Sequence, residues 1–145
     1  MAYTTAISNE KGGVAKTTTT LSLGAALAEL NHRVLLIDLD PQANLSLALG
    51  LETGEAETTS ANVLIENTPL SVAIRKTDIP HLDLVSSNSR IESAEQYLPM
   101  RSNYLTTLRS AIQLVESSYD YILLDCPPAL GAITLNALSA ADLLI

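Results

Sequence analysis

The sequence predicts an α/β fold, in which helices flank a doubly wound, mainly parallel sheet. Short apolar runs of strand length alternate with segments of helical spacing along the 145 residues. Phe and Trp are absent although 47% of the residues are hydrophobic. The core must therefore be built from Leu, Ile, Val and Ala, which suits a parallel sheet covered on both faces. A chain of this length can bury one core, and we predict a single domain over residues 1–145.

The first half of the chain carries two predicted strands, each followed by a predicted helix. The strands are expected at residues 3–8 and 34–38, and the helices at about 17–30 and 43–49. The long helix is expected to bury one stripe of side chains at helical spacing, which consists of Leu23, Ala26, Leu27 and Leu30. The polar and acidic residues 52–60 predict a surface loop.

The second half continues the alternation of strands and helices. Helical turns are predicted at 61–66, a strand at 82–86, a long helix at 103–117, a strand at 121–124 that ends at Asp125, a helix at 132–140, and a closing strand from about 141. The helix at 103–117 is expected to bury Leu105, Leu108, Ile112 and Val115. Because the chain stops inside an apolar strand, we expect it to be the N-terminal part of a longer protein.

The segment from Lys11 to Thr18 lies between the first strand and the first helix. Unpaired N–H groups at a helix start point into such a turn, and the helix dipole favours negative charge there. Lys16 at the end of the turn, followed by the hydroxyl of Thr17, completes a cradle for a triphosphate and magnesium. The segment therefore predicts a phosphate-binding loop for a nucleotide, and the domain is expected to be a nucleotide-binding domain.

The usual G-x-x-x-x-G-K-[ST] pattern is not met, because Glu10 and Ala15 occupy the two glycine positions. A second lysine, Lys11, opens the loop instead. The loop resembles the deviant K-G-G-x-G-K-[ST] loop of the ParA/MinD family of ATPases. The chain departs from that pattern at Ala15, where the family has Gly. The Ala15 methyl is tolerated if φ is negative, whereas a positive φ would cost about 1–2 kcal/mol.

Two further motifs follow predicted strands, at the sheet edge where such folds bind ligands. Residues 38–44 read D-L-D-P-Q-A-N, and residues 125–128 read D-C-P-P. They resemble the ParA switch regions D-x-D-P-Q-x-N and D-x-P-P. MinD proteins usually lack the double proline, so the resemblance is to the ParA/Soj branch.

The resemblance implies ATP or ADP with Mg²⁺ as cofactors, and it assigns roles to individual residues. Lys11, Lys16 and Asp40 are the expected catalytic residues, with Asp40 orienting the attacking water. Thr17 and Asp125 are expected at the metal. Asp38 either lies near the metal or caps the turn that follows its strand. The expected nucleotide-binding residues are Lys11, Gly12, Gly13, Val14, Ala15, Lys16, Thr17 and Thr18.

The resemblance also implies partners. ATP is expected to close a homodimer in which Lys11 reaches the nucleotide of the second subunit. A ParB-like activator and non-specific DNA are the other expected partners, with DNA bound through a C-terminal part beyond this chain. The net charge of −8 argues against DNA binding by these residues alone. We expect a cytoplasmic protein that joins the bacterial nucleoid when ATP is bound, and no membrane span is predicted.

Two alternatives share the same loop: a metabolic enzyme of the cobyrinic acid amidoligase type, and a MinD-like membrane-associated positioning ATPase. The lone cysteine, Cys126, excludes an internal disulfide and is expected to be a small buried filler. The two histidines have no metal-ligand spacing, so no zinc site is predicted. Glu95 is expected on a solvated helix face.

Overall fold

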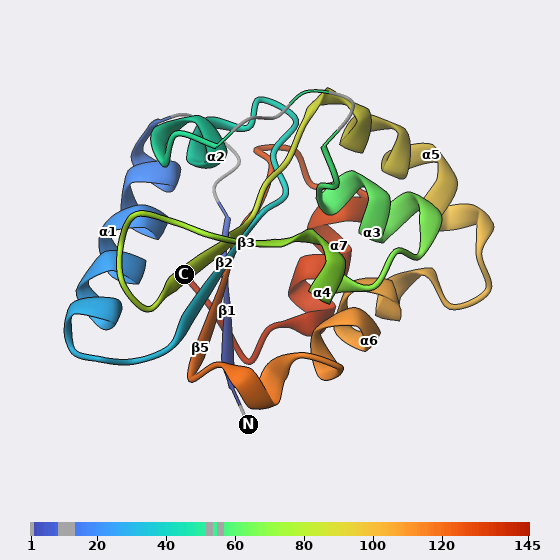
Figure 1. Cartoon of the computed structure of the whole chain (residues 1–145). Helices are drawn as coiled ribbons and strands as arrows, with labels where there is room; N and C mark the ends of the chain where they lie inside the picture. Colours follow the sequence, from blue (N-terminus) through green and yellow to red (C-terminus); the bar gives the residue numbers. More distant parts are fainter. Residues whose placement is uncertain (1, 9–13, 52–53, 55–56) are drawn as a thin grey trace.

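The structure, a computed structural model, describes residues 2–8, 14–51, 54 and 57–145. These residues form a six-stranded sheet with the strand order β3-β4-β2-β5-β1-β6 (Figure 1). The strands are β1 (Tyr3–Ile7), β2 (Val34–Asp38), β3 (Ile74–Lys76), β4 (Leu82–Val85), β5 (Tyr121–Asp125) and β6 (Leu143–Leu144). Neighbouring strands run parallel except for β3, which is antiparallel to β4. The predicted α/β fold with a mainly parallel sheet is confirmed.

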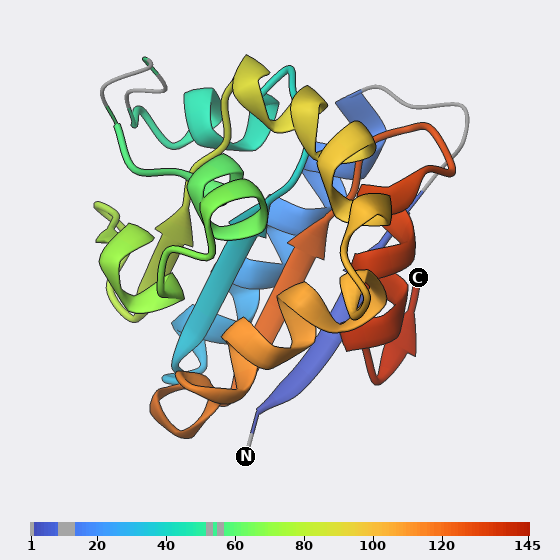
Figure 2. The same cartoon turned by 90° about the vertical axis from the view of Figure 1, so that its right-hand side faces the viewer.

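Helices cover both faces of this sheet (Figures 1 and 2). On one face lie α1 (Val14–Glu29) and α2 (Asn44–Ala48). On the other face lie α3 (Ser60–Glu66), α4 (Leu70–Ala73), α5 (Ala94–Tyr97), α6 (Thr107–Gln113) and α7 (Ala132–Ala140). Two hydrophobic clusters fill the layers between sheet and helices, and they consist mainly of Leu, Ile, Val and Ala side chains, as predicted. The division of the chain into one domain over 1–145 stays a prediction.

The middle of the sheet is the most deeply buried part. All five residues of β2 are buried, and so are the last four of β5. Strands covered on both faces lose the alternation of apolar and polar residues, which explains why β2 and β5 are continuous apolar runs that end in a carboxylate. Both carboxylates, Asp38 and Asp125, are thereby carried to the same buried edge of the sheet.

Helix α1 approaches the sheet through small residues. Thr20, Gly24 and Ala28 recur every fourth position and are buried. A Cβ on Gly24 would lie only 2.8 Å from Cδ2 of Leu36, so glycine is what allows this close approach. The close packing brings the N-terminal turn of α1 against the carboxyl ends of the central strands.

The predicted limits and buried stripe of this helix are partly wrong. The helix begins at Val14 rather than near residue 17. Leu23 and Leu27 are partly buried and pack against the core, but Ala26 is exposed and Leu30 is 69% exposed. A helix that packs this closely buries the small side chains that face the sheet directly, so its larger leucines lie at the borders of the contact.

The long helix predicted at 103–117 is broken into three pieces. A 3₁₀ turn (Tyr104–Thr106) precedes α6, and a second 3₁₀ turn (Glu116–Ser118) follows it. The buried side chain of Asn136 on α7 explains the first break. Its Oδ1 accepts a hydrogen bond from the Leu108 amide at 3.0 Å, and its Nδ2 donates to the Tyr104 carbonyl at 2.6 Å. These groups are thereby removed from a continuous helical ladder.

The break also changes which residues of that segment are buried. Leu108, Ile112 and Val115 are buried as predicted, whereas Leu105 is 41% exposed. Several short elements were not given bounds by the sequence: α4, β3, the 3₁₀ turns Ser89–Ser93 and Leu98–Met100, and α5, for which only Glu95 was expected on a helix. Each has five residues or fewer, which is too short for a hydrophobic period to become visible.

Candidate nucleotide-binding site

The site lies where the carboxyl ends of β1, β5 and β2 meet. These strands are neighbours, so Asp125 at the end of β5 pairs in register with Ile7 of β1 on one side and with Asp38 of β2 on the other. The segment after β1 leads directly into α1, whose first turns lie over this edge. Three motifs that are far apart in the sequence are thus brought to one place.

Lys16 is the centre of the site. Its ammonium Nζ donates to Oδ1 of Asp125 at 3.1 Å and to Oδ2 of Asp40 at 3.3 Å. The side chains of Lys16, Asp125 and Asp40 are 1%, 0% and 8% exposed. At an effective dielectric constant of about 20, a carboxylate at this distance attracts the ammonium by about 5 kcal/mol before desolvation is counted. Phosphate groups that bind here must therefore compete with two carboxylates for the same lysine.

Two threonines complete the contacts of Asp125. The Thr17 hydroxyl donates to Oδ2 of Asp125 at 3.2 Å. The Thr20 hydroxyl lies 3.4 Å from Oδ1 of Asp125 and 3.0 Å from the Lys16 carbonyl, and its single proton can serve one of these acceptors. Sequence reasoning did not include Thr20. Its position four residues after Lys16, on the same side of the helix, is the signal that could have found it.

The charged groups of the site shift one another's pKa values. Burial disfavours the positive charge of Lys16, but Asp125 and Asp40 favour it more strongly, so the pKa of the Lys16 ammonium is raised. Burial raises the pKa of Asp125, and the ammonium of Lys16 and the hydroxyl of Thr17 oppose that rise. Lys16 is therefore held as a charged group between two carboxylates.

Asp38 does not join Lys16. Its Oδ1 accepts from the Asp40 amide at 3.1 Å, and its Oδ2 accepts from the amide and hydroxyl of Ser46 at 3.1 and 2.7 Å. Burial raises the pKa of Asp38 to about 7, and the three hydrogen bonds oppose this rise. These contacts support the capping role, one of the two alternatives for Asp38. The role near the metal stays a prediction, and both carboxylate oxygens are already engaged.

Asp40 is fixed by the turn that follows it. Its Oδ1 accepts from the Gln42 amide at 2.9 Å, and its carbonyl accepts from the Ala43 amide at 2.9 Å. Its Oδ2 is the oxygen that contacts Lys16. The carboxylate therefore faces the first turn of α1, where Lys16 lies.

The phosphate-binding loop is described in part. Lys11, Gly12 and Gly13 lie outside the described residues. Val14 and Ala15 form the first turn of α1, and the backbone of Ala15 does not have a positive φ. The Ala15 methyl is therefore not strained in this conformation, which answers the alternative left open by the sequence. Thr18 is exposed on the same turn.

The loop after β5 begins with the buried Cys126 and Pro127 and continues with exposed residues at 128–130. Burial raises the pKa of the Cys126 thiol to about 12, which agrees with its expected role as an inert filler. The sequence predicted Glu95 on a solvated helix face, and the structure shows instead that its carboxylate is engaged. Its Oε1 accepts from the Ile133 amide at 2.9 Å and so caps the first turn of α7. Gly131 leaves room for this carboxylate.

The donor set near Lys16 suits a magnesium ion. Mg²⁺ prefers oxygen ligands and usually takes only one or two carboxylates, keeping several waters. Asp125 offers a carboxylate and Thr17 a hydroxyl, 3.2 Å apart. No group of three or more His, Cys, Asp and Glu side chains that could hold a metal occurs among the residues that the structure describes. This is compatible with an ion held mainly by phosphates and water.

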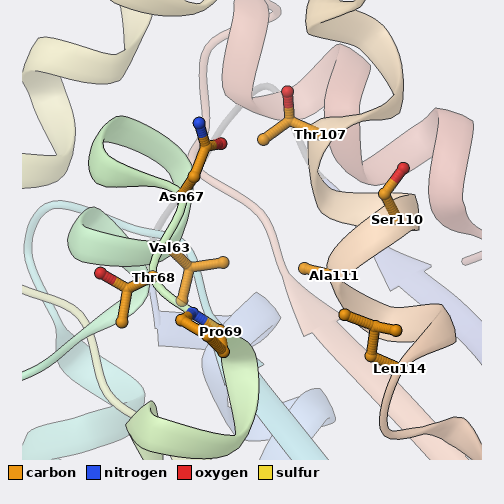
Figure 3. Close-up of a pocket in the computed structure, with 8 residues that line it drawn as sticks. All are labelled: Val63, Asn67, Thr68, Pro69, Thr107, Ser110, Ala111 and Leu114. Carbon is orange, nitrogen blue, oxygen red and sulfur yellow. The ribbon is translucent and has the colours of Figure 1, made fainter.

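A separate hollow lies between α3–α4 and α6 (Figure 3). Its volume is about 200 Å³, and its lining consists of Val63, Asn67, Thr68, Pro69, Thr107, Ser110, Ala111 and Leu114. In the close-up, Val63, Thr68 and Pro69 face Thr107, Ser110 and Ala111 of α6 across the hollow. Its lining contains no ionisable side chain, so it lacks the positive charge that Lys16 supplies at the sheet edge.

Comparison with known proteins agrees with this geometry. A family model described as an AAA domain matches residues 2–145. The chain is 41% identical over 137 residues to the sporulation initiation inhibitor protein Soj of Bacillus subtilis, which covers 94% of this chain and 54% of Soj. It is 42% identical over 139 residues to the chromosome partitioning protein ParA of Caulobacter vibrioides, which covers 94% of this chain and 52% of ParA. The chain spans about half the length of these curated relatives.

A solved structure shows the same fold. The cobyrinic acid a,c-diamide synthase from Mycobacterium smegmatis, with bound ATP analog and magnesium, superposes with a TM-score of 0.94 at 40% identity. The likeness covers 99% of this chain and 59% of that protein. Since the family model matches nearly the whole sequence, the chain belongs to the AAA-domain family, and over 94% of its length it is similar to Soj and ParA.

Proposed function

We propose that the protein binds ATP with Mg²⁺ at this site and hydrolyses it to partition or position DNA or another cargo. The observation that supports this most directly is the convergence of Lys16, Asp40 and Asp125 at the start of α1. These side chains come from three motifs, and each motif follows one of three neighbouring strands. The likeness to Soj and ParA supports the same function.

Lys16 offsets negative charge on the β- and γ-phosphates, in competition with its two carboxylates. Amide groups at the start of α1, from Val14 to Thr18, donate to the phosphates, and the same role is proposed for Lys11, Gly12 and Gly13. Thr17 and Asp125 would hold Mg²⁺. When bound, the ion supplies positive charge to the phosphate oxygens.

Asp40 positions the attacking water. Its carboxylate is buried beside Lys16, and the turn at Pro41 limits its freedom. Phosphoryl transfer passes through a loose transition state, so positioning matters more than strong base catalysis. Hydrolysis of ATP by this water gives ADP and phosphate.

ATP binding is proposed to close a homodimer in which Lys11 contacts the nucleotide of the second subunit. In the same proposal, the ATP-bound dimer binds DNA without sequence preference on the bacterial nucleoid, and a ParB-like partner stimulates hydrolysis. DNA contact is assigned to residues beyond this chain, since 16 acidic residues against 8 Lys and Arg would repel phosphates.

The 40% identity to a cobyrinic acid a,c-diamide synthase favours a related ligase as the second candidate. That likeness concerns the shared fold, and no residue of this chain has been assigned to a corrin-like substrate. For a MinD-like membrane role, the described part of the chain contributes no helix long and apolar enough to cross a bilayer. A terminal amphipathic helix would be the observation that favours such a role.

The test measures nucleotide binding by calorimetry and phosphate release in the same samples of the intact protein. The wild type is expected to bind ATP with Mg²⁺ and to release phosphate without any added metabolite. Lys16→Ala should lose nucleotide binding, whereas Lys76→Ala, which removes an exposed lysine, should bind as the wild type does. Absence of binding by the wild type at millimolar ATP would refute the proposal, and hydrolysis that requires a cobyrinic acid would support the ligase instead.

A further inference from the structure

The loop between β2 and α2 carries Asp40, and two of its features are unfavourable unless other residues stabilise them. Ala43 adopts a left-handed conformation with φ 55°, which a non-glycine residue adopts at a cost of about 1–2 kcal/mol. Ala43 is also the N-cap residue of α2, and its side chain cannot accept the free amide groups of the first helical turn. The loop therefore lacks both an unstrained turn and a local cap.

Asp38 supplies what Ala43 lacks. Its Oδ2 accepts from the amide of Ser46 in the first turn of α2, at 3.1 Å, and so caps the helix from the preceding strand. Its Oδ1 accepts from the amide of Asp40, at 3.1 Å. One carboxylate thus holds the Asp40 amide in the loop and the Ser46 amide in α2, and Asp38 itself is completely buried.

Ser46 ties this carboxylate to the next strand. Its hydroxyl donates to Oδ2 of Asp38 at 2.7 Å and accepts from the Ser87 amide, just after β4, at 3.0 Å. Ser46 is completely buried, so both bonds are shielded from water.

We propose that Asp38 and Ser46 form a clamp that positions Asp40 for ATP hydrolysis. The clamp acts through the backbone of the loop and touches neither Lys16 nor Thr17. In the structure the Asp40 amide is held by Asp38, and Oδ2 of Asp40 lies 3.3 Å from Nζ of Lys16. The proposal rests on the proposed function, and it makes Ser46 and Asp38 positioning residues and leaves Asp40 as the residue that contacts the water.

The test is a double-mutant cycle of Ser46→Ala and Asp40→Ala in the intact protein. Ser46→Ala alone is expected to leave ATP affinity within about twofold and to lower the single-turnover rate roughly tenfold or more, because a displaced positioning group costs rate rather than binding. In the Asp40→Ala background, Ser46→Ala should lower the rate no further. Ser46→Cys, which keeps the size and a weak donor, should give an intermediate rate.

A matched control removes a different buried hydroxyl. Thr59 caps α3 through its contact with the Ala61 amide and does not touch Asp38. Thr59→Val should lower the urea midpoint without changing the rate per folded molecule. If Ser46→Ala keeps the wild-type rate, or lowers it equally in both backgrounds, the clamp is refuted. A wild type that releases no phosphate would instead overturn the proposed function itself, and with it the clamp. If Ser46→Ala does not fold, the same criteria are applied to Ser46→Cys.

Discussion

At the scale of single residues, the decisive feature is a buried lysine whose charge is paired with two carboxylates. Lys16 contacts both carboxylates, so a phosphate competes with them for the same ammonium. Asp40 is the more exposed of the two, and the contact it makes is the longer one. We infer that Asp40 releases Lys16 first, which frees its own carboxylate for a water.

Asp40→Asn should therefore separate nucleotide affinity from hydrolysis. Removing this charge eliminates a competitor for Lys16, so ATP is expected to bind several-fold more tightly. Phosphate release should fall by about 10²-fold, since the group that positions the water is lost. Calorimetry and phosphate release measured together check both effects. Asp78→Asn, at an exposed position, is the control. Weaker ATP binding by Asp40→Asn would contradict the competition.

Cys126 is expected to be chemically inert in the folded protein. Its thiol is completely buried and has a pKa of about 12, so at neutral pH the thiolate is about a thousandfold rarer than for an exposed cysteine. Labelling with a disulfide reagent should be very slow in buffer and complete within minutes in concentrated urea. Rapid labelling of the folded protein would show that β5 opens at its end.

At the scale of elements, α6 and α7 are locked together by one amide side chain. Asn136 is fully buried, and it accepts from the Leu108 amide while donating to the Tyr104 carbonyl. A side chain that satisfies backbone groups on another helix fixes where that helix begins. The packing of α7 in turn fixes the loop that follows Asp125.

Asn136→Ala should destabilise the protein by about 2–4 kcal/mol, because it leaves two buried backbone groups without partners at about 1–3 kcal/mol each. Urea unfolding checks the magnitude. Asn136→Asp keeps the acceptor for Leu108 and loses the donor to Tyr104, and it should still be destabilising. Gln113→Ala, at an exposed position of α6, should change stability by less than about 0.5 kcal/mol. Equal stability of Asn136→Ala and wild type would show that α6 starts where it does for another reason.

At the scale of the whole molecule, charge limits what these residues can bind. The net charge of −8 disfavours contact with nucleic acid, whereas the cluster at Lys16 is suited to a nucleotide. In the proposed dimer these residues contact only the nucleotide, which would lie between the two subunits, so their negative charge does not oppose the proposal. Lys11 is the proposed contact with the nucleotide of the other subunit.

Lys11→Ala should abolish the ATP-dependent dimer while ADP binding stays nearly intact. An ammonium that reaches the phosphates of the other subunit forms charge-assisted hydrogen bonds in a largely dry interface, which are short and strong. Light scattering of the intact protein in ATP, in the Asp40→Ala background to slow hydrolysis, measures the dimer. Lys76→Ala is the control. Normal dimerisation of Lys11→Ala would refute the proposed contact.

The sequence by itself determined the α/β class, because the apolar runs at 34–38 and 121–125 can be buried only in a sheet covered on both faces. It also predicted the candidate site, since the motifs that carry Lys16, Thr17, Asp40 and Asp125 follow predicted strands and resemble ParA/Soj motifs. The structure brings these four residues within hydrogen-bond distance of one another, and their roles stay proposals.

Only the tertiary structure decided which groups face one another. It placed Asp38 on the amides of Asp40 and Ser46, whereas Asp40, only two residues later, contacts Lys16. It divided the helix predicted at 103–117 through Asn136, and it assigned Glu95 to the start of α7. The physical reason is the same in each case. A hydrogen bond between two different elements produces no periodic pattern in the sequence, and its partners are determined only when packing brings the two elements together.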